Sequence, residues 1–293
     1  MVPRSFSLRR LAGLLALAVG LPLAAPAAHA ATVASTPWRA SSAPLARAAV
    51  DGAAASSGCA DYTIYGVRGS GEAWDERPFE QGGTLGMGNT AGPAAAIARS
   101  TIPTSTSVRL VGVRYPAAPV STLVGNPGTF FLSIRNGVTE LKRLIRRSIA
   151  ACPKGRIGLV GYSQGAGVVS ETLRALPRSA FKRVRVAVLF ADTYSAGQRP
   201  YSRNFDQARP LKPRSKKKRR GRGVFGARKL PRALKAKYDV CFLQDIVCNR
   251  TSSTFKTYGQ AFDNGIHTQY KTWRTSVRTG VVQEYGFALA WGA

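Results

Sequence analysis

The five residues Gly161–Gly165, Gly-Tyr-Ser-Gln-Gly, lie between an apolar run and a segment of helical composition. The run 156–160 predicts a strand, and 164–176 predicts a helix. So short a connection demands a tight turn, which the glycines permit because they carry no Cβ. A turn of this kind holds its serine, Ser163, above the edge of a sheet, as the nucleophile is held in many α/β enzymes. The alternative is a tight turn with no chemistry.

Strand-like and helix-like segments alternate through most of the chain, which favours a parallel sheet with helices on both faces. We therefore predict an α/β fold in a single domain, with about five parallel strands. The predicted strands are 61–67, 107–113, 156–160, 184–191 and 237–242. Helices are predicted over 92–100 and 164–176, and apolar residues three or four apart from Phe131 to Ile149 mark one face of a third.

The first 30 residues have the pattern of a secretory signal peptide. A positive region precedes a Leu/Ala-rich core at 11–27, and a small-x-small cleavage pattern ends at Ala30. A membrane anchor is the alternative, but two prolines interrupt the apolar run. We expect export by the general or the twin-arginine route, leaving 263 residues with a net charge of +26. Residues 31–57, rich in Ala, Ser and Pro, would be a flexible leader to a domain at 58–293.

Residues 199–237, which we call the basic segment, contain 16 Lys or Arg, four prolines and one acid, Asp206. The segment shows no core-like periodicity until its end, so we predict an exposed insertion between the fourth and fifth strands. Solvation and solubility are one explanation of its charge. The other is attraction to an anionic polymer, lipid headgroups or nucleic acid.

Export would make the four cysteines, Cys59, Cys152, Cys241 and Cys248, candidates for disulfides, with three possible pairings. A Cys241–Cys248 bond would close a short local loop, and the other bond would then tie the start of the domain to its middle. A zinc site is disfavoured because the chain has only two histidines and lacks paired Cys-x-x-Cys spacing. We expect no metal and no cofactor.

A serine hydroxyl needs a base to become a nucleophile. After cleavage at Ala30, His267 would be the only histidine, and it follows Ser163 as the serine–acid–histidine order of α/β-hydrolases requires. Asp245 is favoured as the acid because a Cys241–Cys248 bond would fix it after the last strand. Asp192, at the end of the fourth strand, is the main rival. The other acids between serine and histidine are Glu171, Asp206, Asp239 and Asp263.

Several motifs, in order, resemble the cutinase family of small α/β-hydrolases over about 59–278, apart from the basic segment. They are Val67–Glu72, Val113–Ala117, Gly161–Gly165, Phe190–Asp192, Cys241-x-x-x-Asp245-x-x-Cys248 and His267-x-x-Tyr270. The aspartate bracketed by two cysteines is the most discriminating of these motifs.

The resemblance implies a role for each matching residue. A catalytic triad would comprise Ser163 as nucleophile, Asp245 as acid and His267 as base. An oxyanion hole would comprise Ser70 and Gln164. The disulfides would be Cys59–Cys152 and Cys241–Cys248. Asp192 would then be a conformational or hydrogen-bonding residue. Two departures, the long stretch 245–267 and the basic segment, leave the choice of substrate open.

The resemblance implies a secreted, extracellular serine esterase that hydrolyses cutin-like polyester or fatty-acyl esters through an acyl-enzyme. Acetylated polysaccharide and phospholipid are alternative substrates. We expect a monomer with no obligate protein partner, and an anionic surface as a further partner of the basic segment. A protein of another class, which binds polyanions or surfaces on a hydrolase fold with little or no catalysis, is the competing hypothesis.

Overall fold

The computed structural model describes residues 59–196, 202–205, 221–234, 236–242, 245–250, 265–271 and 281–293. Within them six strands form one sheet in the order β2-β1-β3-β4-β6-β5, and every neighbouring pair is parallel. The strands are β1 (Tyr62–Val67), β2 (Val108–Gly112), β3 (Arg156–Tyr162), β4 (Val184–Phe190), β5 (Ser202–Phe205) and β6 (Ala236–Phe242). The predicted signal peptide and leader lie outside the described residues.

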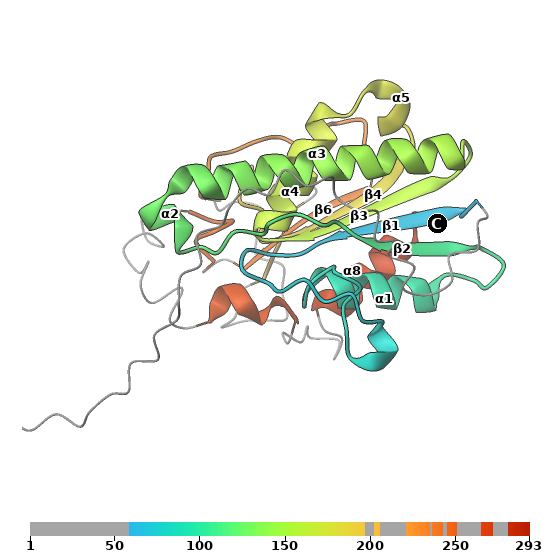
Figure 1. Cartoon of the computed structure of the whole chain (residues 1–293), viewed down its shortest axis with the longest axis horizontal. Helices are drawn as coiled ribbons and strands as arrows, with labels where there is room; N and C mark the ends of the chain where they lie inside the picture. The colour runs from blue at the N-terminus through green and yellow to red at the C-terminus, as the bar shows by residue number, and fades with distance from the viewer. Residues whose placement is uncertain are drawn as a thin grey trace, which may run out of the picture. The chain divides into compact units, whose positions relative to one another are not determined.

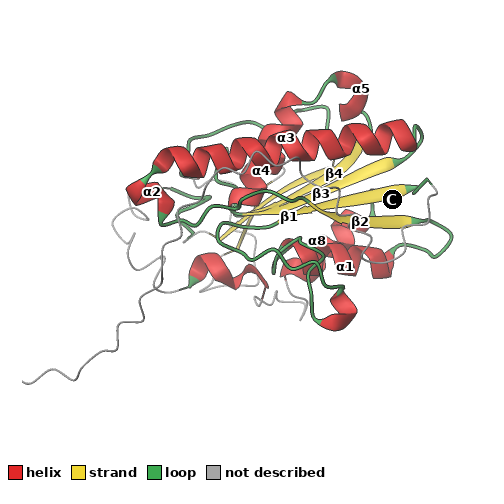
Figure 2. Cartoon of the chain, in the orientation of Figure 1, coloured by secondary structure: helices red, strands yellow, loops and turns green. Residues whose placement is uncertain are grey.

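Helices cover both faces of the sheet, with α3 and α4 on one face and α1 and α8 on the other (Figure 1, Figure 2). The α-helices are α1 (Ala91–Thr101), α2 (Thr122–Gly125), α3 (Pro127–Ala151), α4 (Gln164–Ala175), α5 (Arg178–Phe181) and α8 (Val281–Ala290). Two 3₁₀ helices are η1 (Phe79–Gln81) and η2 (Ile266–Lys271). Of the helices in the described part of the chain, none has the length and apolar character needed to cross a membrane.

Alternation along the strands divides the core into two layers. On β1, Tyr62 and Ile64 pack into the layer that contains α1 and α8, whereas Tyr65 and Val67 pack into the layer that contains α3 and α4. Successive side chains of a strand point to opposite faces, so both faces of a central strand must be apolar. This requirement explains why β1 and β4, in the interior of the sheet, are largely apolar.

The five predicted strands are confirmed, each to within two residues at either end. The α3 face predicted from Phe131 needs one correction: Phe130 is buried, whereas Phe131 is 38% exposed. Neither β5 nor α8 was predicted. A disulfide joins Cys59, before β1, to Cys152, after α3.

The basic segment is not simply an exposed insertion. Its residues 202–205 form β5, which pairs with β6 at the edge of the sheet. Gly221, Gly223 and Leu234 are buried. Arg222, Gly226 and Lys229 are exposed, so the prediction of exposure fails only for the buried residues of the described end, where the amides of Gly221 and Gly223 bond to other loops. Residues 206–220 lie outside the described residues.

Candidate active site

Ser163 alone forms the turn between β3 and α4. Its φ of 53° and ψ of −117° lie where non-glycine residues are rarely found. A Cβ on Gly161 would lie 2.6 Å from the carbonyl oxygen of Gly165, and a Cβ on Gly165 would lie 2.2 Å from that of Val67. Space therefore requires both glycines of the motif, and the turn holds backbone strain at the serine.

Ser163, His267 and Asp245 lie in one hydrogen-bonded line. His267 Nε2 is 2.9 Å from Ser163 Oγ, and His267 Nδ1 is 2.9 Å from Asp245 Oδ2. With its proton on Nδ1, the imidazole donates to the carboxylate and accepts from the hydroxyl. The side chain of Asp245 is fully buried and that of His267 is 12% exposed, so solvent screens these contacts little. The arrangement allows the imidazole to take the serine proton while the carboxylate balances its charge.

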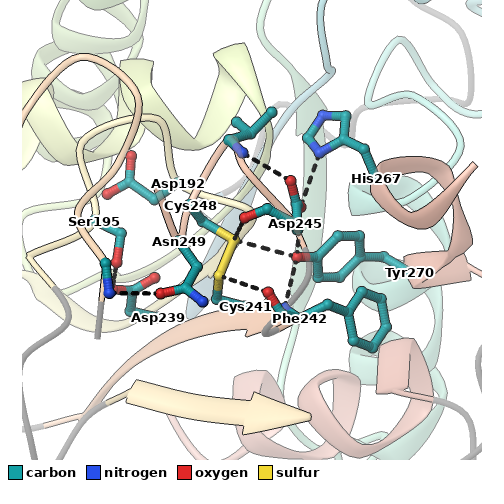
Figure 3. The surroundings of a disulfide bond; sticks show 12 residues. Asp192, Ser195, Asp239, Cys241, Phe242, Asp245, Cys248, Asn249, His267 and Tyr270 are labelled. Atoms are coloured by element: carbon teal, nitrogen blue, oxygen red, sulfur yellow. Dashed lines mark hydrogen bonds and ion pairs between the residues drawn. A yellow bond between two sulfur atoms is a disulfide. The ribbon is translucent and has the colours of Figure 1, made fainter. Parts of the chain in front are cut away.

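Asp245 belongs to a loop that directly follows β6, which we call the acid loop (245–250). The disulfide Cys241–Cys248 closes this loop against the end of the strand. The backbone N–H of Asp245 donates to the carbonyl oxygen of Phe242 at 3.0 Å, and the N–H of Val247 donates to Asp245 Oδ1 at 2.9 Å. Figure 3 shows the carboxylate between the disulfide and His267. The cystine and these hydrogen bonds hold the loop and one oxygen of the carboxylate.

Ser70 and Gln164 both bind the carbonyl oxygen of Ala118. Ser70 Oγ donates to it at 2.6 Å, and Gln164 Nε2 donates at 3.3 Å. Ser133 Oγ accepts the N–H of Ala118 and donates to Gln164 Oε1, both at 3.0 Å. Gln164 is also the first residue of α4, whose opening backbone amides have no partner within the helix and form its positive end. One loop position thus connects the two predicted oxyanion-hole residues.

Three further contacts hold the loop that contains Ser70. The carboxylate of Glu72 accepts the N–H of Gly69. The Tyr115 hydroxyl donates to the carbonyl oxygen of Arg68 at 2.7 Å, and the Arg68 guanidinium donates to the carbonyl of Tyr115. Burial lowers the pKa of Arg68 and raises that of Tyr115. The two motifs that follow β1 and β2 therefore form one interlocked unit.

The profile of the cutinase family matches residues 58–276. The chain belongs to the cutinase family. Its curated relatives include a cutinase of Botryotinia fuckeliana, 28% identical over 145 residues that make up 50% of this chain and 63% of that protein. Another is Cutinase CUT1 of Coprinopsis cinerea, 30% identical over 136 residues, 46% of this chain and 59% of that protein. Carboxylesterase Culp1 of Mycobacterium tuberculosis is 33% identical over 89 residues, 30% of this chain and 37% of that protein.

The chain spans less than two thirds of the length of each of these relatives. Two solved structures are also similar. A cutinase-like protein from Cryptococcus sp. has a TM-score of 0.49 and 20% identity, over 82% of this chain and 100% of that chain. The catalytic core of acetyl xylan esterase from Trichoderma reesei has a TM-score of 0.49 and 19% identity, over 72% of this chain and 97% of that chain.

In this cutinase-family chain, Asp192 lies across the disulfide from His267, beside Ser195 and Asp239 (Figure 3). Its Oδ1 accepts the N–H of Tyr194 at 3.0 Å. Burial, and after it the charge of Asp239, raises the pKa of Asp192 well above its usual range. A carboxyl that resists ionisation and lies apart from the imidazole is poorly suited to balance an imidazolium.

The remaining acids between Ser163 and His267 have other partners or are not described. Glu171 Oε2 lies 2.7 Å from the guanidinium of Arg228. Asp239 accepts a hydrogen bond from Ser195 Oγ. Asp206 and Asp263 lie outside the described residues. Asp245 is therefore the one described acid that contacts the histidine.

Two tyrosines to which the sequence analysis gave no role touch this line of residues. The ring of Tyr162 stacks on the imidazole of His267 with centroids 5.2 Å apart, and its hydroxyl donates to the carbonyl oxygen of His267 at 2.6 Å. The hydroxyl of Tyr270 donates to Asp245 Oδ2 at 2.8 Å. The sequence indicates that Tyr162 lies near Ser163 and that Tyr270 lies near His267. The bond from Tyr270 to Asp245 could not be predicted, because it depends on how the acid loop folds.

The described end of the basic segment binds two loops of the site. The N–H of Val224 donates to the carbonyl of Val247 at 2.9 Å, and the N–H of Gly223 donates to the carbonyl of Ser195 at 2.8 Å. Val224 also packs against Ile246 and Val247. Residues 221–225, which we call the strap, therefore connect the acid loop to the turn that follows β4.

Proposed function

We propose that this chain is a secreted serine esterase in which Ser163 is the nucleophile, His267 the general base and Asp245 the acid that orients it. The observation that carries the proposal is the hydrogen-bonded line through the three side chains, with both contacts at 2.9 Å. Membership of the cutinase family supports it. The two disulfides support an oxidising compartment, and with it export.

In the first half of the reaction, His267 Nε2 takes the proton of Ser163 as the serine oxygen bonds to the ester carbonyl carbon. The carbonyl electrons move to oxygen, and the backbone amides of Gln164 and Ser70 would donate to that oxyanion. The bond to the alkoxy oxygen then breaks, and the alcohol leaves with the proton that His267 returns. The acyl group stays on Ser163.

In the second half, water attacks the acyl carbon while His267 removes its proton. The carboxylic acid leaves, and Ser163 recovers its hydrogen. Asp245 holds the imidazole in the Nδ1–H tautomer and stabilises the imidazolium that forms. The position of Ser163 at the start of α4 supports the same chemistry, because the helix dipole favours negative charge there.

For the substrate, we propose esters with apolar acyl or alkyl groups, such as cutin-like polyester or fatty-acyl esters. The names of the curated relatives, cutinase and carboxylesterase, support this class. Val120, two residues after Ala118, is 38% exposed, and Leu132, next to Ser133, is 48% exposed. Apolar surface so close to the residues that hold Gln164 suits an apolar chain. Acetylated polysaccharide and phospholipid are the alternative substrates.

Nitrophenyl esters from acetyl to palmitoyl test the proposal, assayed on the wild-type chain and on Ser163→Ala. We expect Ser163→Ala to lose several orders of magnitude in kcat. For the wild type, butyryl and longer esters should be turned over with a higher kcat/KM than acetyl. A preference for acetyl would favour the polysaccharide alternative, and full activity in Ser163→Ala would refute the mechanism.

A second proposal concerns the basic segment, which we propose attracts the enzyme to anionic surfaces. Its 16 Lys or Arg against one acid support this role. Charge of this density raises the rate of encounter with an anionic interface without touching the chemical step. The competing hypothesis is a protein that binds anionic surfaces and has little or no catalysis. The Ser163→Ala variant separates surface binding from catalysis, because it should bind anionic surfaces as before and lose esterase activity.

A further inference from the structure

We propose that Tyr270 is a positioning residue for the reaction: its hydroxyl fixes the Asp245 carboxylate in the orientation that His267 requires. The proposal rests on the function proposed above. Tyr270 donates to Asp245 Oδ2, the same oxygen that lies 2.9 Å from His267 Nδ1. Figure 3 shows the phenol reaching the carboxylate from the side of η2, which also carries His267.

The hydroxyl of Tyr270 has only one possible direction for its proton. It accepts the backbone N–H of Phe242 at 3.0 Å, and a backbone amide can only donate. It also lies 3.4 Å from Sγ of Cys248, which carries no proton because it is in a disulfide. The carboxylate, 2.8 Å away, is the strong acceptor that remains. The bond to Asp245 is therefore fixed by chemistry as well as by distance.

The Asp245 carboxylate is then held on three sides. Oδ1 accepts the N–H of Val247 at 2.9 Å, and Oδ2 accepts from both Tyr270 and His267. The backbone contact alone leaves the carboxylate free to turn about the bond between Cβ and its carboxyl carbon. The added phenol contact fixes that rotation and presents one lone pair of Oδ2 to the imidazole.

The ring of Tyr270 is fully buried, so it cannot touch a substrate. It packs against Phe242 with centroids 4.3 Å apart and against Tyr162 with centroids 6.0 Å apart. These contacts do not involve the hydroxyl and remain in Tyr270→Phe. That variant therefore removes the two hydrogen bonds and little else, and any effect on turnover must pass through Asp245 or the Phe242 amide.

Tyr62→Phe is the matched control. Tyr62 is equally buried, and its hydroxyl donates to the carbonyl oxygen of Leu289 at 2.8 Å, in the core layer of α1 and α8. Both variants lose one buried hydroxyl, but Tyr62→Phe loses the bond to Leu289, whereas Tyr270→Phe loses the bonds to Asp245 and to the Phe242 amide. Comparing them separates the loss of a buried hydrogen bond from the loss of the contact with Asp245.

The first measurement is kcat and KM on a soluble nitrophenyl butyrate, with Ser163→Ala assayed beside it. Tyr270→Phe should lower kcat by about tenfold, the effect of losing one hydrogen bond to a charged group, and leave KM within about twofold. Tyr62→Phe should leave kcat unchanged. In an Asp245→Ala background, Tyr270→Phe should have no further effect. An equal loss in both backgrounds, or kcat equal to that of Tyr62→Phe, would overturn the proposal.

The second measurement observes the imidazole directly. The chain has only two histidines, so removal of the predicted signal peptide, or His29→Gln in the full chain, leaves His267 as the single imidazole. In that background the proton resonance of His267 Nδ1 should move in Tyr270→Phe and stay in Tyr62→Phe. Placing 3-fluorotyrosine at position 270 keeps both hydrogen bonds with a stronger donor and should move the resonance too, which covers the case that Tyr270→Phe does not fold. An unmoved resonance overturns the proposal, whereas turnover by Ser163→Ala would refute the proposed function instead.

Discussion

The backbone N–H of Val224 donates a hydrogen bond to the carbonyl oxygen of Val247 at 2.9 Å. The N–H of Val247 in turn donates to Asp245 Oδ1. One residue of the acid loop thus holds the carboxylate with its amide and is itself held, through its carbonyl, by the strap. The described end of the basic segment consequently supports the proposed catalytic acid.

Gly223→Ala should disturb the strap and lower ester turnover. A Cβ at Gly223 would lie 2.3 Å from the carbonyl oxygen of Thr193, so the strap must shift away from the turn after β4. Overpacking of this kind typically costs about 1–3 kcal/mol of stability. Gly125→Ala, where nothing lies within 4 Å, is the control. Thermal unfolding and kcat/KM of both variants check the prediction, and equal behaviour would refute it.

Removing the Cys241–Cys248 disulfide should affect activity more than removing Cys59–Cys152. The short loop holds Asp245, whereas the long one joins the start of β1 to the end of α3. Chain entropy assigns about 2.5 kcal/mol to the short loop and about 4.5 kcal/mol to the long one, so the order for stability should be reversed. Paired Cys→Ala variants, compared by unfolding and by kcat/KM at a temperature where both are folded, measure the two effects.

The exported protein should also contain no free thiol when unfolded without reductant. Four titratable thiols in the secreted form would contradict the disulfides. Gradual reduction should lower turnover before far-ultraviolet circular dichroism changes. Loss of secondary structure at the same reductant concentration as loss of activity would contradict the local role of the Cys241–Cys248 bond.

Asp192→Asn should raise stability at neutral and alkaline pH and keep most activity. Burial, then the charge of Asp239, raises the pKa of Asp192 in the folded chain. An acid with a raised pKa stabilises the fold fully below its unfolded pKa of about 4, and this stability is lost as pH rises through the folded value. Asparagine does not titrate and can still accept the N–H of Tyr194. As pH rises through the folded pKa of Asp192, the unfolding temperature of Asp192→Asn should therefore decline less than that of the wild type.

The same variant tests the assignment of the acid. Asp245→Asn should lower kcat by about 10⁴-fold, as expected when the imidazole loses its orienting carboxylate. Asp192→Asn should leave most of the wild-type kcat. A severe loss in Asp192→Asn together with a mild one in Asp245→Asn would show that Asp192 is the acid.

Neutralising the centre of the basic segment should weaken binding to anionic vesicles and leave turnover of a small neutral ester nearly unchanged. The variant changes five residues to Gln: Lys216, Lys217, Lys218, Arg219 and Arg220. Surface charges act over about 8 Å at physiological salt and over a longer range at low salt. The loss of vesicle binding should therefore be largest at low ionic strength. Sedimentation with phosphatidylglycerol vesicles measures it.

A control variant replaces three cations elsewhere on the surface with Gln, and its effect is compared per charge removed. Arg135, Arg146 and Arg147 are exposed on α3, outside the basic segment. An equal loss of vesicle binding per charge in the two variants would show that net charge alone is responsible. Loss of soluble-ester turnover with unchanged vesicle binding would show instead that the segment forms part of the active site.

Much of the fold could be predicted because its central strands are buried on both faces. Tyr62, Ile64, Tyr65 and Val67 all pack into the core, so β1 is a largely apolar run that Thr63 and Gly66 interrupt. β5 was missed because Ser202–Phe205 is short and lies among prolines and arginines. An edge strand gains its stability from pairing with β6, which sequence periodicity does not reveal.

The residues of the candidate site also fall into those that could be predicted from the sequence and those that could not. Gly161–Gly165 could be predicted because the spacing of its glycines follows from steric limits at one turn. Tyr270 and Ser133 received no role because each acts through a residue distant in sequence, Asp245 and Gln164 respectively. Such contacts arise only when separate loops meet at the carboxyl ends of the strands.

The central claim, that Ser163 is a nucleophile activated by His267, is tested most directly by covalent labelling with a fluorophosphonate. The serine oxygen displaces fluoride from phosphorus, so the chain gains the mass of one phosphonyl group less one proton. We predict a single adduct, located on Ser163 by peptide mass spectrometry, and about 10³-fold slower labelling in His267→Ala. An adduct on another serine, or continued ester turnover by a chain fully labelled at Ser163, would contradict the claim.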